Sequence, residues 1–152
     1  MVCWGNICRS PIAEGILRHL AEEQGAAIDV DSAGTSDEHR GSPPHRPALA
    51  EAARRGIDIS DQRSRKVRRS DFDDFDLILT ADDMVDSWVR RQAPPGSRAR
   101  IKRMTESLSD FEQYPEVPDP YYGSAHDYRE VYDLLERAMT ELLRSLREEG
   151  GS

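Results

Sequence analysis

The stretch Cys3-Trp-Gly-Asn-Ile-Cys-Arg-Ser-Pro11 decides the fold, because it leads directly into the first predicted helix. Pro11 suits the first turn of a helix, and apolar residues then recur on one helical face, at Ile12, Ile16, Leu17, Leu20 and Ala21. Gly25 is a typical residue at the end of a helix. A loop that opens a helix in this way presents backbone N–H groups and a positive dipole end, which together favour a bound anion.

Outward from this loop, segments with strand patterns alternate with segments with helix patterns. Short strands are predicted at 28–32, 76–81 and 100–104. Helices are predicted at 48–55, from a cap at Asp82 or Asp83 to Gln92, and from Val131 to Leu146. Segments 33–47 and 105–123 are rich in proline and are predicted to be irregular. The alternation predicts a parallel sheet covered by helices on both faces, with ligands at the carboxyl ends of its strands.

The composition is that of one polar, acidic domain. The chain has 152 residues, with 29 Asp and Glu against 21 Lys and Arg, and a formal net charge of −8. This charge disfavours a nucleic-acid partner. No apolar run approaches the roughly 20 residues of a membrane helix and no secretory signal is visible, so we expect neither a membrane span nor export. We expect 1–152 to form a single domain, with a frayed tail at 148–152.

The usage of cysteine and histidine does not indicate a metal site or a disulfide framework. The two cysteines, Cys3 and Cys8, lie close together, whereas a disulfide framework distributes its cysteines along the chain. The four histidines show no ligand spacing, so we interpret them as scattered surface residues. We therefore expect no cofactor and no metal, and thiols that suit a reducing cytoplasm or reactive chemistry.

Each residue type in the opening loop supplies something that a phosphate site needs. Gly5 allows the backbone to approach an anion, and Asn6 tolerates a left-handed conformation, so that successive N–H groups can point to one centre. The positive electrostatic field of these N–H groups and of the helix N-terminus favours the thiolate form of Cys3, which is the nucleophilic form. The planar guanidinium of Arg9 matches two phosphoryl oxygens, and Ser10 can donate a hydrogen bond to the thiolate.

The whole loop closely resembles the phosphate-binding loop of the low-molecular-weight protein tyrosine phosphatases. Further matching segments run along nearly the whole chain: Ser32-Ala-Gly-Thr35, Arg55-Gly-Ile57, Arg65, Phe75-Asp-Leu-Ile78 and Asp119-Pro-Tyr-Tyr122. The resemblance implies an α/β fold of three layers, with a short parallel sheet of about four strands and the phosphate loop between the first strand and the first helix. It also implies the hydrolysis of phosphotyrosine in protein substrates, without a metal.

The resemblance also implies roles for single residues. Cys3 is then the nucleophile that forms a phosphocysteine, Arg9 clamps the phosphate, and Asp119 is first the general acid and then the general base. The remaining members of the phosphate-binding loop are Trp4, Gly5, Asn6, Ile7, Cys8 and Ser10. Ser32 matches a serine that orders the loop through the asparagine, and a plain strand-end hydroxyl is the alternative.

The residues around Asp119 support its role as a general acid independently of the resemblance. A thiolate that cleaves an aryl phosphate needs a proton for the leaving phenolate, and Asp119 can supply it. Pro118 and Pro120 stiffen the segment, since a residue before proline is held in an extended conformation. Tyr121 and Tyr122 offer aromatic faces to a phenyl group. An ordinary Asp-Pro turn is the alternative, and the thiol loop weighs against it.

The chain departs from the family pattern at two positions. Glu38 stands where members often carry an aromatic residue that walls the substrate cleft, and Gln62 stands where many have histidine. We hypothesise that Trp4 replaces the missing wall, and the alternative is that its ring packs beneath the loop. Cys8 is either a redox shield, which traps oxidised Cys3 as a disulfide, or only a thiol in the pocket wall.

Other functions fit parts of this pattern. Arsenate reductases of this fold that use a thiol cascade need two more downstream cysteines, and this chain has none after Cys8. Arginine phosphatases resemble the loop but carry threonine where this chain has Ile7. A phosphate-binding module without catalysis is expected to lose Cys3, Arg9 or Asp119, and all three are present. A sulfurtransferase has no need of the Asp119 segment. These differences favour phosphotyrosine.

The start of the chain is short for this fold. Only Met1 and Val2 precede Cys3, and two residues span at most ~7 Å, whereas family members usually carry about five apolar residues there. Because we expect two residues to be too few for a central strand, we predict that the natural protein begins several residues upstream with an apolar segment. The alternative is that another segment or a second chain fills the gap.

Overall fold

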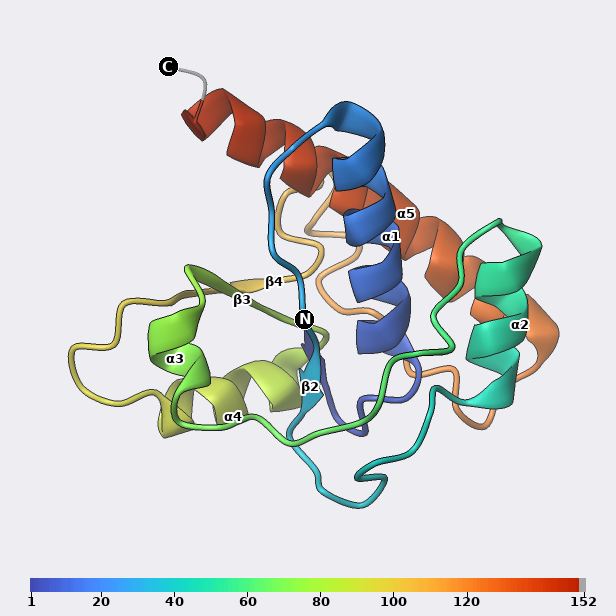
Figure 1. Cartoon of the computed structure of the whole chain (residues 1–152), viewed down its shortest axis with the longest axis horizontal. Helices are drawn as coiled ribbons and strands as arrows, with labels where there is room; N and C mark the ends of the chain where they lie inside the picture. The colour runs from blue at the N-terminus through green and yellow to red at the C-terminus, as the bar shows by residue number, and fades with distance from the viewer. Residues whose placement is uncertain (151–152) are drawn as a thin grey trace.

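A computed structural model describes residues 1–150 and contains a four-stranded sheet in the order β2-β1-β3-β4. The strands are β1 (Val2–Cys3), β2 (Ala33–Gly34), β3 (Leu77–Thr80) and β4 (Arg100–Arg103). All three pairings are parallel. Each strand is followed by a helix or a long connection before the next strand begins, which confirms the predicted α/β fold (Figure 1).

Strand β1 is the centre of the sheet although it has two residues. It pairs with β2 through Val2 and Cys3 and with β3 through Val2 and Thr80. The expectation that two residues are too few for a central strand is therefore wrong. Backbone bonds beyond the strand ends extend the ladder, because Thr35 N donates to Cys3 O and Ser36 N donates to the next carbonyl, of Trp4.

Within residues 1–150, the structure forms five helices. They are α1 (Arg9–Gln24), α2 (Arg46–Arg54), α3 (Asp71–Asp74), α4 (Asp83–Gln92) and α5 (Ala125–Gly150). Helix α1 ends at Gly25, whose left-handed conformation (φ 64°) closes the helix as the sequence predicts. Helices α1 and α2 both pack against the long helix α5 (Figure 1).

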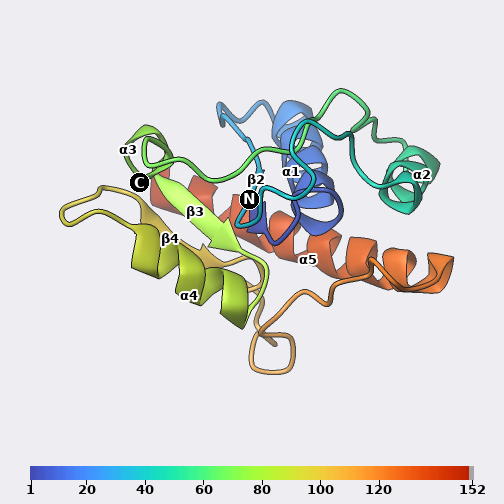
Figure 2. The ribbon, with the colours of Figure 1, turned by 90° about the horizontal axis from the view of Figure 1, so that it is seen from below.

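The two faces of the sheet carry separate apolar clusters. Successive side chains of a strand point to opposite faces. Cys3 and Leu79 accordingly belong to the larger cluster, with α1, α2 and α5, whereas Val2 and Ile78 belong to the smaller one, with α3 and α4. Figure 2 shows α4 and α5 on different sides of the strands. The structure thus confirms the three layers.

Several predicted elements differ from the structure. The segment 33–47, predicted to be irregular, contains β2 and the first residues of α2. Residues 28–32 form no strand, and the pairing of β2 with β1 starts only at Ala33, opposite Val2. The carbonyl of Val30, in the stretch 28–32, instead accepts from the Arg18 side chain. Helix α5 begins at Ala125 and continues through 148–150, where we expected fraying. The rest of the expected tail, 151–152, lies outside the described residues.

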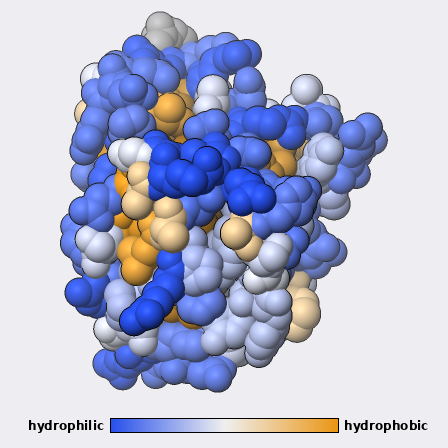
Figure 3. All heavy atoms as spheres, turned by 90° about the vertical axis from the view of Figure 1, so that its right-hand side faces the viewer, coloured by the Kyte–Doolittle hydropathy of each residue, from blue (hydrophilic) through white to orange (hydrophobic). Residues whose placement is uncertain are grey.

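The surface follows the polar composition. The side of the molecule that carries α2 is mostly hydrophilic, and apolar atoms reach it only in small patches (Figure 3). Within residues 1–150, no helix combines the length and the apolar character that crossing a bilayer requires.

Candidate active site

The opening loop lies between β1 and α1, as predicted, with Cys3 at the end of the central strand. The Cys3 thiol is buried, its residue being 3% exposed. Its Sγ accepts from the backbone N–H of Asn6 at 3.3 Å and lies 3.0 Å from Ser10 Oγ. Asn6 reaches this geometry with a left-handed backbone (φ 55°), which asparagine adopts more readily than most residues. The loop therefore curls around the sulfur atom.

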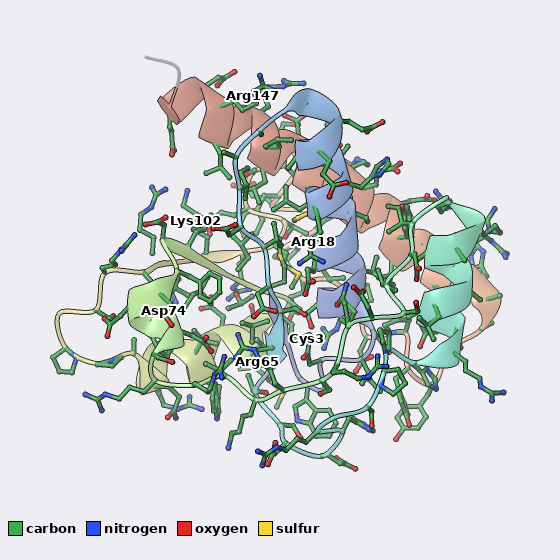
Figure 4. All side chains as sticks on the ribbon, viewed as in Figure 1. Cys3, Arg18, Arg65, Asp74, Lys102 and Arg147 are labelled. Carbon is green, nitrogen blue, oxygen red and sulfur yellow. The ribbon has the colours of Figure 1, made fainter. Side chains whose placement is uncertain are left out.

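The side chain of Asn6 fastens the loop to its surroundings. Its Nδ2 donates to Ser10 Oγ at 2.8 Å and to Ser32 Oγ at 3.0 Å, and its Oδ1 accepts from the backbone N–H of Arg65 at 3.0 Å. The bond to Ser32 is the one that the family resemblance implies. Cys3 and Arg65 lie on either side of β2 (Figure 4), because β2 pairs with β1 and Gly34 also bridges to Lys66. Three segments distant in sequence thus meet at one amide.

Close packing on β2 also requires a glycine. A Cβ atom at Gly34 would lie 2.7 Å from the carbonyl oxygen of Trp4 and 3.2 Å from the Asn6 backbone nitrogen. Contacts this short with backbone atoms leave no space for a side chain. Ser64 adds a further tie, because its Oγ donates to the Gly5 carbonyl at 3.0 Å. The loop is therefore held from behind by backbone as well as by side chains.

Arg9 is buried at the start of α1 and is oriented by two partners. Its Nη1 donates to Asp82 Oδ2 at 2.7 Å and to the Val117 carbonyl at 2.9 Å. Burial works against its charge, but the neighbouring thiolate and carboxylates outweigh burial and raise the pKa of Arg9 above its ordinary value. Asp82 also accepts from Val85 N–H and caps α4, as predicted, so one carboxylate fixes a helix end and a guanidinium.

Asp119 comes to this cluster from more than a hundred positions further along the chain. Its Oδ2 lies 3.8 Å from Arg9 Nη2, and its side chain is 52% exposed. Its Oδ1 accepts from the backbone N–H of Tyr121 at 3.1 Å. The segment is attached to the sheet just before, since Val117 N donates to the Ala81 carbonyl at 2.7 Å. The structure therefore brings Cys3, Arg9 and Asp119 together.

A cavity of about 300 Å³ opens above these groups. Its lining combines loop residues with an aromatic side, and comprises Cys3, Trp4, Gly5, Ile7, Cys8, Arg9, Glu38, His39, Asp119, Tyr121 and Tyr122. Trp4 is 45% exposed and its ring meets His39 edge to face at 6.2 Å between centroids. The alternative that Trp4 packs beneath the loop is therefore wrong. Tyr122 lies at the rim and is 97% exposed.

Two histidines that we interpreted as scattered surface residues lie at the site. His39 lines the cavity, and His45 is half-buried behind it. His45 Nδ1 is 2.9 Å from the hydroxyl oxygen of Tyr128, which is 3.2 Å from Cys8 Sγ. The interpretation fails for both because the long loop before α2 folds back onto the thiol loop. Only the proximity of His45 to the prolines of that loop marks it in the sequence, and that signal is not specific.

The structure shows the contacts and the burial of two further residues near the thiol loop, Cys8 and Gln62. Burial raises the pKa of the Cys8 thiol to about 12, so the group is neutral near pH 7. Its role as a redox shield stays a prediction. Gln62 donates from Nε2 to the Pro11 carbonyl at 3.0 Å, which attaches its segment to the start of α1. Across residues 1–150, no three His, Cys, Asp or Glu side chains gather as metal ligands would.

Comparison with known proteins identifies a family for this chain. The family model of the low molecular weight phosphotyrosine protein phosphatases matches residues 1–152. The protein-tyrosine-phosphatase YfkJ of Bacillus subtilis is 38% identical, covering 97% of this chain and 94% of YfkJ. A protein tyrosine phosphatase structure from Entamoeba histolytica superposes with a TM-score of 0.91 at 34% identity, covering 99% of this chain and 96% of that one.

The same fold also occurs in an enzyme named for another phosphorylated residue. A Drosophila arginine phosphatase superposes with a TM-score of 0.91 at 24% identity, covering 96% of this chain and 95% of that one. At this identity the likeness concerns the fold alone. The match of the family model over the whole length, together with relatives above 30% identity, settles the membership. The chain belongs to the low molecular weight phosphotyrosine protein phosphatase family.

Proposed function

We propose that this chain hydrolyses phosphotyrosine in proteins through a phosphocysteine intermediate on Cys3. The observation that carries the proposal is the meeting of a buried thiol, a buried guanidinium and an open carboxyl group at one cavity. The names of the relatives support it, since YfkJ and the Entamoeba enzyme are both called protein tyrosine phosphatases.

In the first step, the Cys3 thiolate attacks phosphorus opposite the bond to the phenolic oxygen. The S–P bond forms while the P–O bond breaks, and Asp119 transfers its proton to the leaving oxygen. The exposure of Asp119 suits this role, because the leaving group must depart into the open part of the cavity. The carboxylate that remains faces the phosphocysteine.

In the second step, Asp119 accepts a proton from a water molecule whose oxygen attacks phosphorus. The S–P bond breaks, inorganic phosphate is released, and Cys3 returns as thiolate. Ser10 Oγ, at 3.0 Å from Sγ, donates a hydrogen bond to the departing sulfur. Arg9 and the loop N–H groups hold the phosphoryl oxygens in both steps, and since they are fixed in advance they need not reorganise as charge develops.

The rival activities differ in what they need from the chain. A thiol cascade for arsenate needs cysteines beyond Cys3 and Cys8, and the sequence has none. The aromatic side of the cavity, formed by Trp4, His39 and Tyr121, suits a phenyl ring better than an arginyl chain. Ile7, in place of the threonine of arginine phosphatases, points the same way.

The deciding experiment compares turnover of a phosphotyrosine peptide, a phosphoarginine peptide and arsenate by the wild type and by Cys3→Ser. We expect turnover of the phosphotyrosine peptide alone, and loss of it in Cys3→Ser. Melting temperatures of both proteins serve as the control for folding. A preference for phosphoarginine, or turnover that survives in Cys3→Ser, would contradict the proposal.

We propose further that the chain forms one phosphatase domain over 1–152, acts on phosphoproteins and works in the cytoplasm. Both cysteines are free thiols, and Cys3 must stay reduced to act as a nucleophile. Fractionation of cells that express the tagged protein tests the location.

A further inference from the structure

His45 connects the thiol loop on one side of the cavity with the aromatic side chains on the other. It stands just before α2, and its backbone N–H donates to the carbonyl of Ile7 in the thiol loop at 2.8 Å. Its Nδ1 lies 2.9 Å from the Tyr128 hydroxyl on α5, and the same hydroxyl lies 3.2 Å from Cys8 Sγ. Tyr128 is 1% exposed, so this chain of hydrogen bonds is closed to solvent at its centre.

The face of the same imidazole supports the aromatic side. The ring of His45 stacks on that of Tyr121, with 4.7 Å between centroids and 22° between planes. Tyr121 lines the cavity, and its backbone N–H donates to Asp119 Oδ1. Tyr122 also contacts Tyr121 edge to face, but Tyr122 is almost fully exposed and has no such attachment to the interior. The ring of His39 is a third neighbour, at 6.1 Å between centroids. Of the three, His45 is the one whose ring is bonded to a buried side chain, that of Tyr128.

We propose that His45 is a positioning and specificity-determining residue: it holds the Tyr121 ring at a set distance from the thiol loop and so favours phosphate esters with an aromatic group. Stacking fixes one face of Tyr121, and the Tyr128 hydroxyl fixes the His45 ring in turn. A Tyr121 ring held in this way loses less freedom when it meets a phenyl group, and the affinity for that group rises. The inference rests on the proposed function.

The phosphate cradle does not depend on the imidazole. Cys3 is held by Ser10 and by the Asn6 N–H, and Asn6 is held by Ser32 and Arg65. The imidazole ring of His45 takes no part in that network. Its removal should therefore weaken binding of the aryl group and leave binding of free phosphate unchanged, which separates positioning from general support of the loop.

The experiment measures kcat and KM for a phosphotyrosine peptide and the inhibition constant of inorganic phosphate, for the wild type and His45→Ala. We expect KM to rise about five-fold, with kcat changed by less than about two-fold and the phosphate constant unchanged. His126→Ala is the matched control, because His126 lies exposed on α5 and pairs with Glu130. It should behave like the wild type.

Two further variants keep the test valid if His45→Ala folds poorly. His45→Phe keeps a ring that can stack but loses the bond to Tyr128, and Tyr128→Phe removes the hydroxyl while His45 stays. Both should raise KM about two-fold in the same direction, without change in the phosphate constant. A phosphate constant that rises in step with KM, or a KM equal to that of the wild type in all three variants, overturns the inference. A wild type without activity on aryl phosphates overturns the proposed function, and the inference with it.

Discussion

The thiol loop and the segment 117–122 meet at one cavity but are built in opposite ways. Cys3 and Arg9 are each 3% exposed, and each is hydrogen-bonded to a side chain of the protein, Cys3 to Ser10 and Arg9 to Asp82. The side chain of Asp119 is half exposed, and Tyr122 is almost fully exposed. The phosphate side is rigid and closed, whereas the side that meets the rest of the substrate is open.

The difference follows from what each side binds. A phosphoryl group has the same shape and charge in every substrate. Hydrogen-bond donors that are fixed in advance therefore stabilise it without a further loss of conformational entropy. The protein that carries the phosphotyrosine varies, and the acid must meet both a leaving phenolate and an incoming water molecule. An exposed carboxylate on a stiff segment satisfies both needs. The four predictions below test this contrast, from the largest expected effect to the smallest.

Arg9→Lys should remove the planar phosphate clamp on the rigid side of the cavity and lower kcat by roughly 1,000-fold. Lysine keeps the charge, but a single ammonium group cannot bind Asp82, the Val117 carbonyl and two phosphoryl oxygens in one plane. Steady-state rates with a phosphotyrosine peptide measure the loss, and Arg91→Lys on the exposed end of α4 is the control. More than about a tenth of the wild-type kcat would contradict the role of the planar group.

Asp119→Asn should remove the general acid on the open side of the cavity and lower kcat by about 100-fold with phenyl phosphate. The loss should be much smaller with a substrate whose leaving group needs no proton, such as dinitrophenyl phosphate. Comparison of the two substrates under the same conditions gives the result. If both rates fell equally, Asp119 would not be the acid.

Ser32→Ala should loosen the thiol loop without opening it. The Asn6 Nδ2 group loses one of its two acceptors in a buried place, which costs about 1–3 kcal/mol of stability and lowers the melting temperature by several degrees. We expect kcat to fall about ten-fold, because the N–H groups around Cys3 lose their fixed direction. Ser70→Ala, at an exposed position before α3, is the control. An unchanged melting temperature and kcat would show that Ser32 is a plain strand-end hydroxyl.

Trp4→Ala should affect the aromatic side alone. If the exposed Trp4 ring replaces the wall that is missing at Glu38, KM for aryl phosphates should rise about three- to ten-fold, with a smaller change in kcat. Tyr114→Ala, an exposed aromatic residue that does not line the cavity, is the matched control. A KM like that of the wild type would remove the hypothesis and leave Tyr121 as the main aromatic contact.

Much of the fold could be predicted from local patterns in the sequence. The helical face after Pro11, the cap at Asp82 and the apolar run before it all depend on neighbours within a few residues, so the sequence could place α1, α4 and β3 closely. The strand expected at 28–32 fails for the complementary reason. Pairing needs a second strand at the right position in space, and the register of β1 with β2 starts only at Ala33.

For the site, the contiguous thiol loop was readable from the sequence because its chemistry lies within nine residues. The link between Cys3 and Asp119 came only from the resemblance to a family, since nothing local connects residues so far apart. The resemblance already implied the contact of Ser32 with Asn6. What tertiary structure alone decided is the other partners behind the site: Asp82 on Arg9, and His45 on Tyr121 and Tyr128. These contacts depend on where loops fold back over the sheet. An aspartate and a histidine at the ends of loops leave no periodic trace in the sequence, so only their positions in space give them their function.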